Sequence, residues 1–217
     1  MSDSPFIAPY SQLPETLPIF PLPGAIVMPG SELPLNIFEP RYLNMVSDAL
    51  STHHMIGMIQ PDPNARDANV LCHTGCAGRI TQYRETNDGR IEMVLSGVCR
   101  YDLGEELPTT RGYRLIVPDW SRFSDDYTNH EDPLRREHDH LIRMLKRYFD
   151  AKGLQADWSM LERLSTVRLM NSLSMALPIS EQDKQLLLET VEPAQRLHTF
   201  TSLLGDGFQA SGSVTRH

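Results

Sequence analysis

The chain has 217 residues, of which 40% are hydrophobic and 22% are charged, and its formal net charge is −8 at pH 7. This composition predicts a globular protein with one large domain or two small ones, and the acidic balance argues against general affinity for nucleic acid or anionic membranes. The sequence contains no run of about 18 apolar residues, so no transmembrane helix is predicted. The N-terminal segment lacks the pattern of a signal peptide, and we therefore expect a cytoplasmic protein.

Prolines are concentrated at the start of the chain, where nine of the 16 fall within the first 40 residues. An interior proline costs a helix about 3 kcal/mol, so a long N-terminal helix is excluded. We expect a flexible arm over 1–14 and a short strand at 17–20. Alternating apolar residues predict a strand at 32–38, and Pro34 places it at an edge or a bulge. A helix is predicted over 41–50.

A β-rich stretch follows this helix. The hydrophobic patterns predict strands at residues 54–60, 76–85, 90–99, 98–106 and 112–118. The pair Asp88-Gly89 is a strong hairpin signal, because it supplies the positive φ angle that a tight turn needs. So many short strands with one helix predict a β-rich lobe over 15–120, folded as a small barrel or a folded sheet.

The pattern changes after Trp120. Residues 121–130 are polar and aperiodic, which predicts a linker, and from residue 131 the apolar residues recur with a helical period. Ser180 has the position of a helix N-cap, and Gly205 and Gly207 are expected to end the last helix. We therefore predict a helical bundle over 131–205 and a flexible tail over 206–217.

The cysteines are the first candidate for chemistry. Cys72, His73 and Cys76 are spaced like part of a zinc site, but zinc usually needs a second pair of ligands, and Cys99 stands alone. An odd number of cysteines also argues against a disulfide framework. The pattern favours ordinary strand or turn cysteines and predicts no metal site.

No catalytic residue is predicted. Ser180 and Lys184 are four residues apart, but helix capping explains Ser180 without a nucleophilic role. The chain also has no G-x-x-x-x-G-K-[ST] phosphate-binding loop. The basic side chains between Arg135 and Lys152 are interspersed with acidic ones, which is typical of a solvated helix face. We expect neither enzymatic activity nor a cofactor.

The junction between the predicted strand and helix carries the candidate binding residues Phe38, Glu39, Arg41 and Tyr42. One interpretation is a structural lock, in which the two charged residues satisfy each other or the local backbone and the two aromatic rings pack. The other interpretation is part of a peptide-binding surface. The residue pattern favours the lock, and peptide binding is the functional alternative.

Several segments together carry a family resemblance. They are residues 17–24, 27–30, 33–42, 75–80, 88–90, 95–100, 177–180, 184–188 and 196–197. In order and spacing they resemble the substrate-binding N-terminal domain of the ATP-dependent Lon protease and, more closely, small stand-alone bacterial proteins made of that domain. The resemblance covers roughly residues 15–205.

The resemblance implies an α+β fold with a PUA-like β-barrel lobe followed by a C-terminal helical bundle. It also implies a non-enzymatic role in binding unfolded or flexible protein segments, with a protease or a chaperone as a further candidate partner. The ATPase and Ser–Lys peptidase domains of full Lon have no counterpart in these residues, so their activities are not expected. The alternative is an RNA-binding PUA-like protein, which the net charge disfavours.

Overall fold

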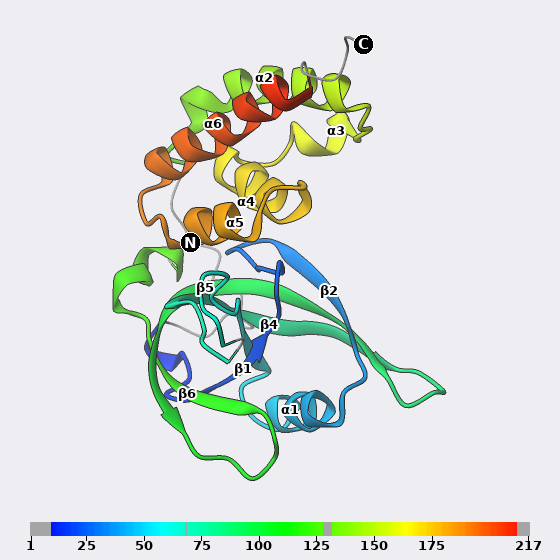
Figure 1. The fold of residues 1–217 in the computed structure, drawn as a ribbon, viewed down its shortest axis with the longest axis vertical. Helices are drawn as coiled ribbons and strands as arrows, with labels where there is room; N and C mark the ends of the chain where they lie inside the picture. The colour runs from blue at the N-terminus through cyan, green and yellow to red at the C-terminus, as the bar shows by residue number, and fades with distance from the viewer. Residues whose placement is uncertain (1–9, 68, 128–131, 212–217) are drawn as a thin grey trace. The chain divides into compact units, whose positions relative to one another are not determined.

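The computed structural model describes residues 10–67, 69–127 and 132–211 (Figure 1). The chain divides into two compact units, Met1–Thr128 and Asn129–His217. Unit 1 holds the sheet and one α-helix, and unit 2 is helical. This mixture confirms the predicted α+β class.

Unit 1 is built on a six-stranded sheet. Its strands are β1 (Leu17–Pro21), β2 (Glu32–Ile37), β3 (Met55–Ile59), β4 (Thr74–Glu85), β5 (Ile91–Leu107) and β6 (Arg114–Asp119). Their order is β2-β5-β4-β3-β1-β6, and β5 also pairs with β6. Strands β5, β4, β3, β1 and β6 therefore form a closed ring of pairings. Only β1 and β3 are parallel within this sheet.

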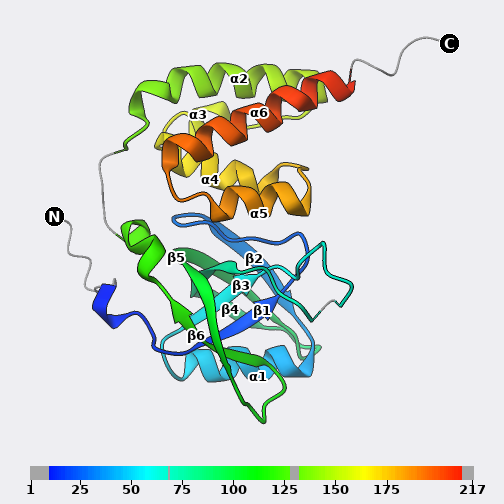
Figure 2. The ribbon, with the colours of Figure 1, turned by 60° about the vertical axis from the view of Figure 1, so that its left-hand side comes forward.

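Helix α1 (Pro40–Leu50) lies along one side of this sheet in both views (Figures 1 and 2) and packs on β1 and β3. Strand β2 lies at an edge of the sheet, which confirms the position expected from Pro34. The turn before β5 contains Gly89 with φ of +78°, as expected for Asp-Gly. The two strands predicted over 90–99 and 98–106 are instead one continuous strand, β5.

The interior of unit 1 is centred on Tyr101 of β5, which is fully buried. A Cβ atom at Gly57 or Gly75 would lie 2.6 or 2.5 Å from the Tyr101 hydroxyl oxygen, so both positions require glycine. The buried residues around this ring are Leu17, Ile19, Met55, Ile59, Ala77 and Ile116. Apolar side chains from four strands, β1, β3, β4 and β6, thus pack around one aromatic ring supplied by β5.

Within the predicted linker over 121–130, residues Ser121–Tyr127 form the 3₁₀ helix η2, which is kinked at Phe123. The Asp126 carboxylate accepts hydrogen bonds from Arg100 Nε and Nη2, each at 2.8 Å, and from the Arg100 backbone N–H at 3.1 Å. Phe123 is buried, with the guanidinium groups of Arg100 and Arg122 lying 4.4 and 4.6 Å from its ring centre. A polar segment without periodicity is therefore ordered by contacts with β5. Residues 128–130 lie outside the described residues.

The last residues of the predicted arm over 1–14 have defined structure. Tyr10–Gln12 form a short 3₁₀ helix, η1, and Leu13 packs against the sheet cluster. The Pro14 carbonyl accepts a hydrogen bond from the indole of Trp120 at 3.3 Å. The proline-containing segment over 10–14 is therefore packed against the rest of unit 1. Residues 1–9 lie outside the described residues.

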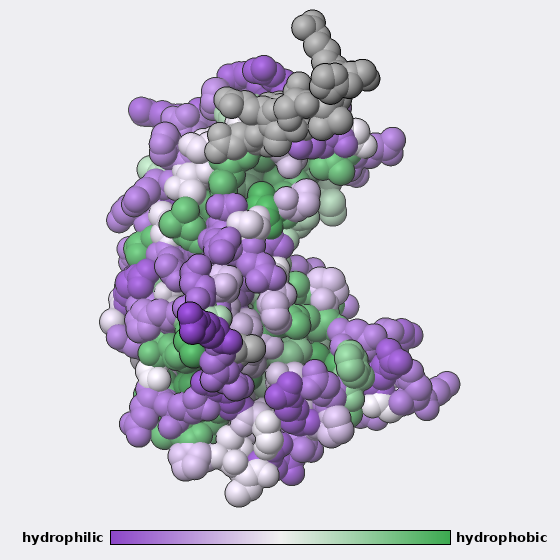
Figure 3. Space-filling model, viewed as in Figure 1, coloured by the Kyte–Doolittle hydropathy of each residue, from purple (hydrophilic) through white to green (hydrophobic). Residues whose placement is uncertain are grey.

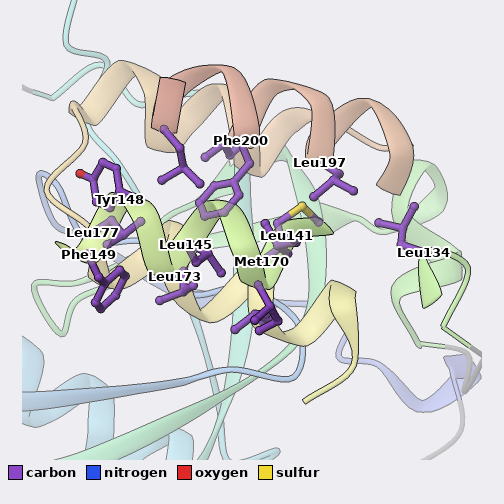
Figure 4. Close-up of a cluster of buried hydrophobic side chains, with 14 residues drawn as sticks. Leu134, Leu141, Leu145, Tyr148, Phe149, Met170, Leu173, Leu177, Leu197 and Phe200 are labelled. Atoms are coloured by element: carbon purple, nitrogen blue, oxygen red, sulfur yellow. The ribbon is translucent and has the colours of Figure 1, made fainter. Parts of the chain in front are cut away.

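Unit 2 is a helical bundle. It consists of η3 (Arg135–Glu137), α2 (His138–Lys152), α3 (Trp158–Leu161), α4 (Thr166–Ala176), α5 (Glu181–Glu189) and α6 (Pro193–Ser211). Figure 4 shows its core, where Leu141 and Leu145 of α2 lie among Met170 and Leu173 of α4 and Phe200 of α6. These positions follow the helical spacing of apolar residues in the sequence.

Capping residues explain several helix ends in this unit. The Ser180 hydroxyl accepts a hydrogen bond from Asp183 N at 3.1 Å, which confirms its predicted N-cap role. Helix α2 ends at Gly153, whose φ is +65°. The expectation that Gly205 and Gly207 end the last helix is wrong, because α6 runs through both to Ser211, into the predicted tail over 206–217. A glycine inside a helix costs only about 1 kcal/mol and does not by itself end it. Residues 212–217 lie outside the described residues.

The Arg100–Asp126 ion pair generates a stability prediction. We expect Asp126→Ala to lower the free energy of unfolding by about 3–5 kcal/mol, because it removes the acidic member of a buried ion pair and so takes from Arg100 its carboxylate acceptor. The control is Glu92→Gln, which removes the exposed partner of Arg84 and should cost less than about 1 kcal/mol. Urea unfolding followed by circular dichroism measures both, and equal costs would contradict the assigned role.

Candidate functional site

The strand-to-helix junction brings together three of the four predicted binding residues. Pro40 occupies the first turn of α1, and the extended backbone of Glu39 (φ −72°, ψ 132°) precedes it. The Glu39 carboxylate accepts a hydrogen bond from Arg41 Nε at 3.0 Å. Tyr42 is buried, its ring centre lies 4.3 Å from that of Phe20, and the Arg41 guanidinium lies 4.5 Å from it. These contacts are those of a structural lock.

Phe38 does not take part in this packing. Its side chain is 62% exposed, and its ring lies 5.8 Å from the guanidinium of Arg90, the residue before β5. Arg90 is also paired with Asp88 at 2.9 Å. Phe38 therefore faces outward beside the β4–β5 hairpin. It makes none of the contacts that link Glu39, Arg41 and Tyr42 at the junction.

A groove of about 550 Å³ lies on the same part of unit 1. We name it the hairpin groove. It is lined by Pro34, Leu35, Asn36, Gln82, Tyr83, Arg84, Glu92, Met93 and Val94. The register places Val94 of β5 between Pro34 of β2 and Gln82 of β4. Figure 3 shows hydrophobic residues gathered beside the hairpin and hydrophilic residues at its outer end.

Tyr83 gives the hairpin groove an exposed aromatic side chain. It is 56% exposed, although β-strand residues of this size usually contribute to a core. Sequence reasoning did not single out Tyr83 or the other groove residues on β4 and β5. The available signal was an aromatic residue in a polar strand end next to the predicted hairpin, at Gln82-Tyr83-Arg84.

A second hollow, of about 250 Å³, lies beside the buried ring of Tyr42. We name it the Tyr42 cavity. It is lined by Pro21, Arg41, Tyr42, Pro61, Asn69, Leu71, Gly112, Tyr113 and Arg114. Burial raises the pKa of Tyr42, while the nearby Arg41 guanidinium opposes that shift. The cavity thus combines apolar walls, two phenol rings and two guanidinium groups.

The cysteines are packed inside unit 1. Cys72 Sγ lies 3.6 Å from the Pro61 carbonyl oxygen, and Cys99 Sγ lies 3.4 Å from that of Phe123. Burial is the largest cause that raises the pKa of Cys76, and it raises that of Cys99 to about 12. Within the described ranges, no three His, Cys, Asp or Glu residues lie close enough together to hold a metal ion. The thiols behave as small buried side chains.

The Ser180 hydroxyl is used in the cap of α5, where it also donates to the Asp183 carboxylate at 2.6 Å. Among the described helices, none has both the length and the hydropathy needed to cross a membrane.

A single protein-family model matches nearly all of the chain. The family model described as the ATP-dependent protease La (LON) substrate-binding domain matches residues 16–206. Lon protease 2 of Bdellovibrio bacteriovorus is 24% identical over 207 residues, covering 89% of this chain and 25% of the relative. The Lon protease of Heliobacterium modesticaldum is 26% identical over 196 residues, covering 88% and 24%. The chain spans about a quarter of the length of these relatives.

Solved structures with the same fold cover the chain to a similar extent. The crystal structure of a Lon N-terminal domain protein from Xanthomonas campestris is 26% identical, with a TM-score of 0.64, and covers 86% of this chain and 97% of that one. The N-terminal domain of the Mycobacterium avium complex Lon protease is 16% identical, with a TM-score of 0.67, and covers 88% and 98%. At 16% identity, the similarity to the Mycobacterium avium complex domain shows a shared fold alone.

The pKa of Cys99 predicts a pH dependence of stability. In the unfolded chain this thiol ionises near pH 9.0, whereas in the folded protein it stays neutral up to about pH 12. Its contribution to stability is therefore fully present below pH 9 and is lost as pH rises toward 12. We expect the free energy of unfolding of the native sequence to fall relative to Cys99→Ala between pH 8.5 and about 10.5, as measured by urea unfolding. A constant difference between the two proteins would contradict this assignment.

Proposed function

Because the chain belongs to the family of the ATP-dependent protease La (LON) substrate-binding domain, we propose that it is a non-enzymatic module that binds unfolded or flexible segments of other proteins. The match spans residues 16–206 and so includes most of both units. The matched domain is a substrate-binding domain and not a catalytic one. Its relatives are named as proteases, which makes a protease a candidate partner, with a chaperone as the other.

The hairpin groove, together with Phe38, is the surface proposed to receive these segments. The observation that carries this choice is the exposure of two large aromatic side chains, Phe38 and Tyr83, at and beside a groove of about 550 Å³. Exposed aromatic surface next to a concavity is typical of interaction sites, because contact with an apolar partner removes it from water. An unfolded segment offers the apolar side chains that a folded protein hides.

Charges around this surface are paired. Arg41 is bonded to Glu39, Arg84 to Glu92 and Arg90 to Asp88. Arg84 and Arg90 at the hairpin therefore offer little net field for a polyanion, and this arrangement supports peptide binding over the RNA-binding alternative. Arg41 and Glu39 support the surface through this pairing, and Tyr42 supports it through packing.

The edge of β2 determines how a segment is held. The Ser31 carbonyl accepts a hydrogen bond from Gly97 N at 2.8 Å, so Ser31 faces β5. Along the continuous register from there, the backbone groups of Glu32, Pro34 and Asn36 point to the free edge. Pro34 has no N–H to donate, so an added strand would lack a hydrogen bond at its centre. We infer that side-chain contacts hold the segment.

The finer fold assignment belongs to the same proposal. The closed ring of pairings through β5, β4, β3, β1 and β6 supports the PUA-like barrel expected from the family resemblance. A cytoplasmic location is also part of it, as the compartment where unfolded segments would meet such a module.

The groove assignment predicts a binding defect. We expect the double variant Phe38→Ser, Tyr83→Ser to bind a reduced and alkylated, fluorescently labelled unfolded protein at least about 10-fold more weakly, because each truncation removes an aromatic contact worth about 1 kcal/mol or more. The measurement is fluorescence anisotropy. Both side chains are exposed, so the fold should be unaffected.

Met160→Ser is the matched control, since Met160 is 68% exposed in unit 2 and should not change this affinity. The proposed function fails if the native protein shows no binding at high micromolar concentration. Salt-dependent retardation of RNA in a gel-shift assay would instead favour the RNA-binding alternative.

A further inference from the structure

We propose that the Tyr42 cavity binds the carboxyl-terminal residue of a polypeptide, with its carboxylate held between Arg41, Arg114 and the Tyr42 hydroxyl. This inference rests on the proposed function, because it assigns one end of the bound segment to a site of its own. It concerns a site separate from the hairpin groove, since the two share none of their lining residues.

The size of the cavity suits a single residue. Its volume of about 250 Å³ lies below the roughly 300–1,000 Å³ typical of small-molecule sites. Pro21, Pro61 and Leu71 provide apolar lining, and the rings of Tyr42 and Tyr113 provide aromatic walls. An apolar side chain fits this lining better than a polar one, because no buried polar group would be left without a partner.

The charges that line the cavity have one sign. Among the nine lining residues two are arginines and none is acidic. Glu106 pairs with Arg114 at 2.6 Å and Glu39 pairs with Arg41 at 2.9 Å, but neither glutamate lines the cavity. The positive ends of both pairs therefore contribute to this wall. Such a wall attracts an anionic group on the ligand, because opposite charges attract.

Both guanidinium groups keep donors for a ligand. A guanidinium has five N–H donors. Arg114 donates from Nε and Nη2 to Glu106 and from Nη1 to the Asn69 carbonyl, at 2.9, 2.6 and 2.9 Å. Arg41 donates to Glu39 alone among the described residues. The Tyr42 hydroxyl has no hydrogen-bond partner within that same part of the chain, so its O–H is available to donate to an entering carboxylate.

The wall opposite α1 is held in place before any ligand arrives. The Asp48 carboxylate accepts hydrogen bonds from Arg111 Nε and Nη2 at 3.0 and 2.9 Å, and from the Tyr113 hydroxyl at 2.8 Å. Gly112 between them has φ of +84°, and a Cβ there would lie 3.3 Å from Arg41 Cβ. The β5–β6 loop is thereby fixed against α1, and preorganisation of this kind lowers the entropic cost of binding.

The test uses a 15-residue fluorescein-labelled unstructured peptide that ends in leucine, as the free acid and as the C-terminal amide. Fluorescence anisotropy should show the native protein binding the acid at least about 10-fold more tightly than the amide, the effect expected for charge-assisted hydrogen bonds. Arg114→Gln should remove most of this preference. Tyr42→Phe should reduce it without disturbing the packed ring, which guards against a folding defect in the first variant.

Two controls separate this site from the groove. Arg143→Gln, an exposed arginine on α2, should leave the preference unchanged. The double variant Phe38→Ser, Tyr83→Ser should weaken acid and amide by the same factor. Equal binding of acid and amide to the native protein overturns the inference and leaves the proposed function standing. Binding of neither peptide, together with no binding of the unfolded protein, overturns the proposed function itself. If N-acetyl-leucine displaces the peptide at equal affinity, the site takes a free organic acid and the assignment to a chain end is wrong.

Discussion

Continuous backbone pairing of one strand, β5, determines the architecture of unit 1. One edge of β5 pairs with β4, while its other edge pairs first with β2 and then with β6. The change of partner depends on close backbone approach, because a Cβ at Gly97 would lie 2.1 Å from the Met28 carbonyl oxygen, and one at Gly104 would lie 2.1 Å from that of Val117. Through this exchange the same strand lines the hairpin groove and closes the ring.

The middle of β5 also anchors the η2 segment that comes after the sheet. Tyr101 enters the ring of strands, while its neighbour Arg100 packs on Phe123 and binds Asp126. A buried ion pair is weak evidence for added stability, since desolvation offsets the attraction, but it strongly disfavours any arrangement that separates the partners. The η2 segment is thus fixed in one place on β5.

Arginines paired with carboxylates recur across unit 1. The two candidate surfaces differ in whether both members of the pair, or only the arginine, line the surface. At the hairpin groove, Arg84 and its partner Glu92 both line the surface, so apolar contact dominates there. At the Tyr42 cavity, Arg114 lines the wall and its partner Glu106 does not. A single fold therefore presents one neutral surface and one cationic hollow. Of the four residues expected at the strand-to-helix junction, Phe38 lies beside the hairpin, whereas Arg41 and Tyr42 line the cavity.

Local chemistry let the sequence alone determine the α+β class, the edge position of β2 through Pro34, the Asp-Gly hairpin and the Ser180 cap. Each depends on residues that are neighbours in the chain, where φ preferences and side-chain periodicity act directly. Only the tertiary structure decided the continuity of β5, the order of η2, the passage of α6 through Gly205 and the membership of both surfaces. Arg114 joins Arg41 at one cavity although 73 positions separate them in the chain. Such contacts arise from strand pairing and burial summed over the whole unit, and no local pattern records them.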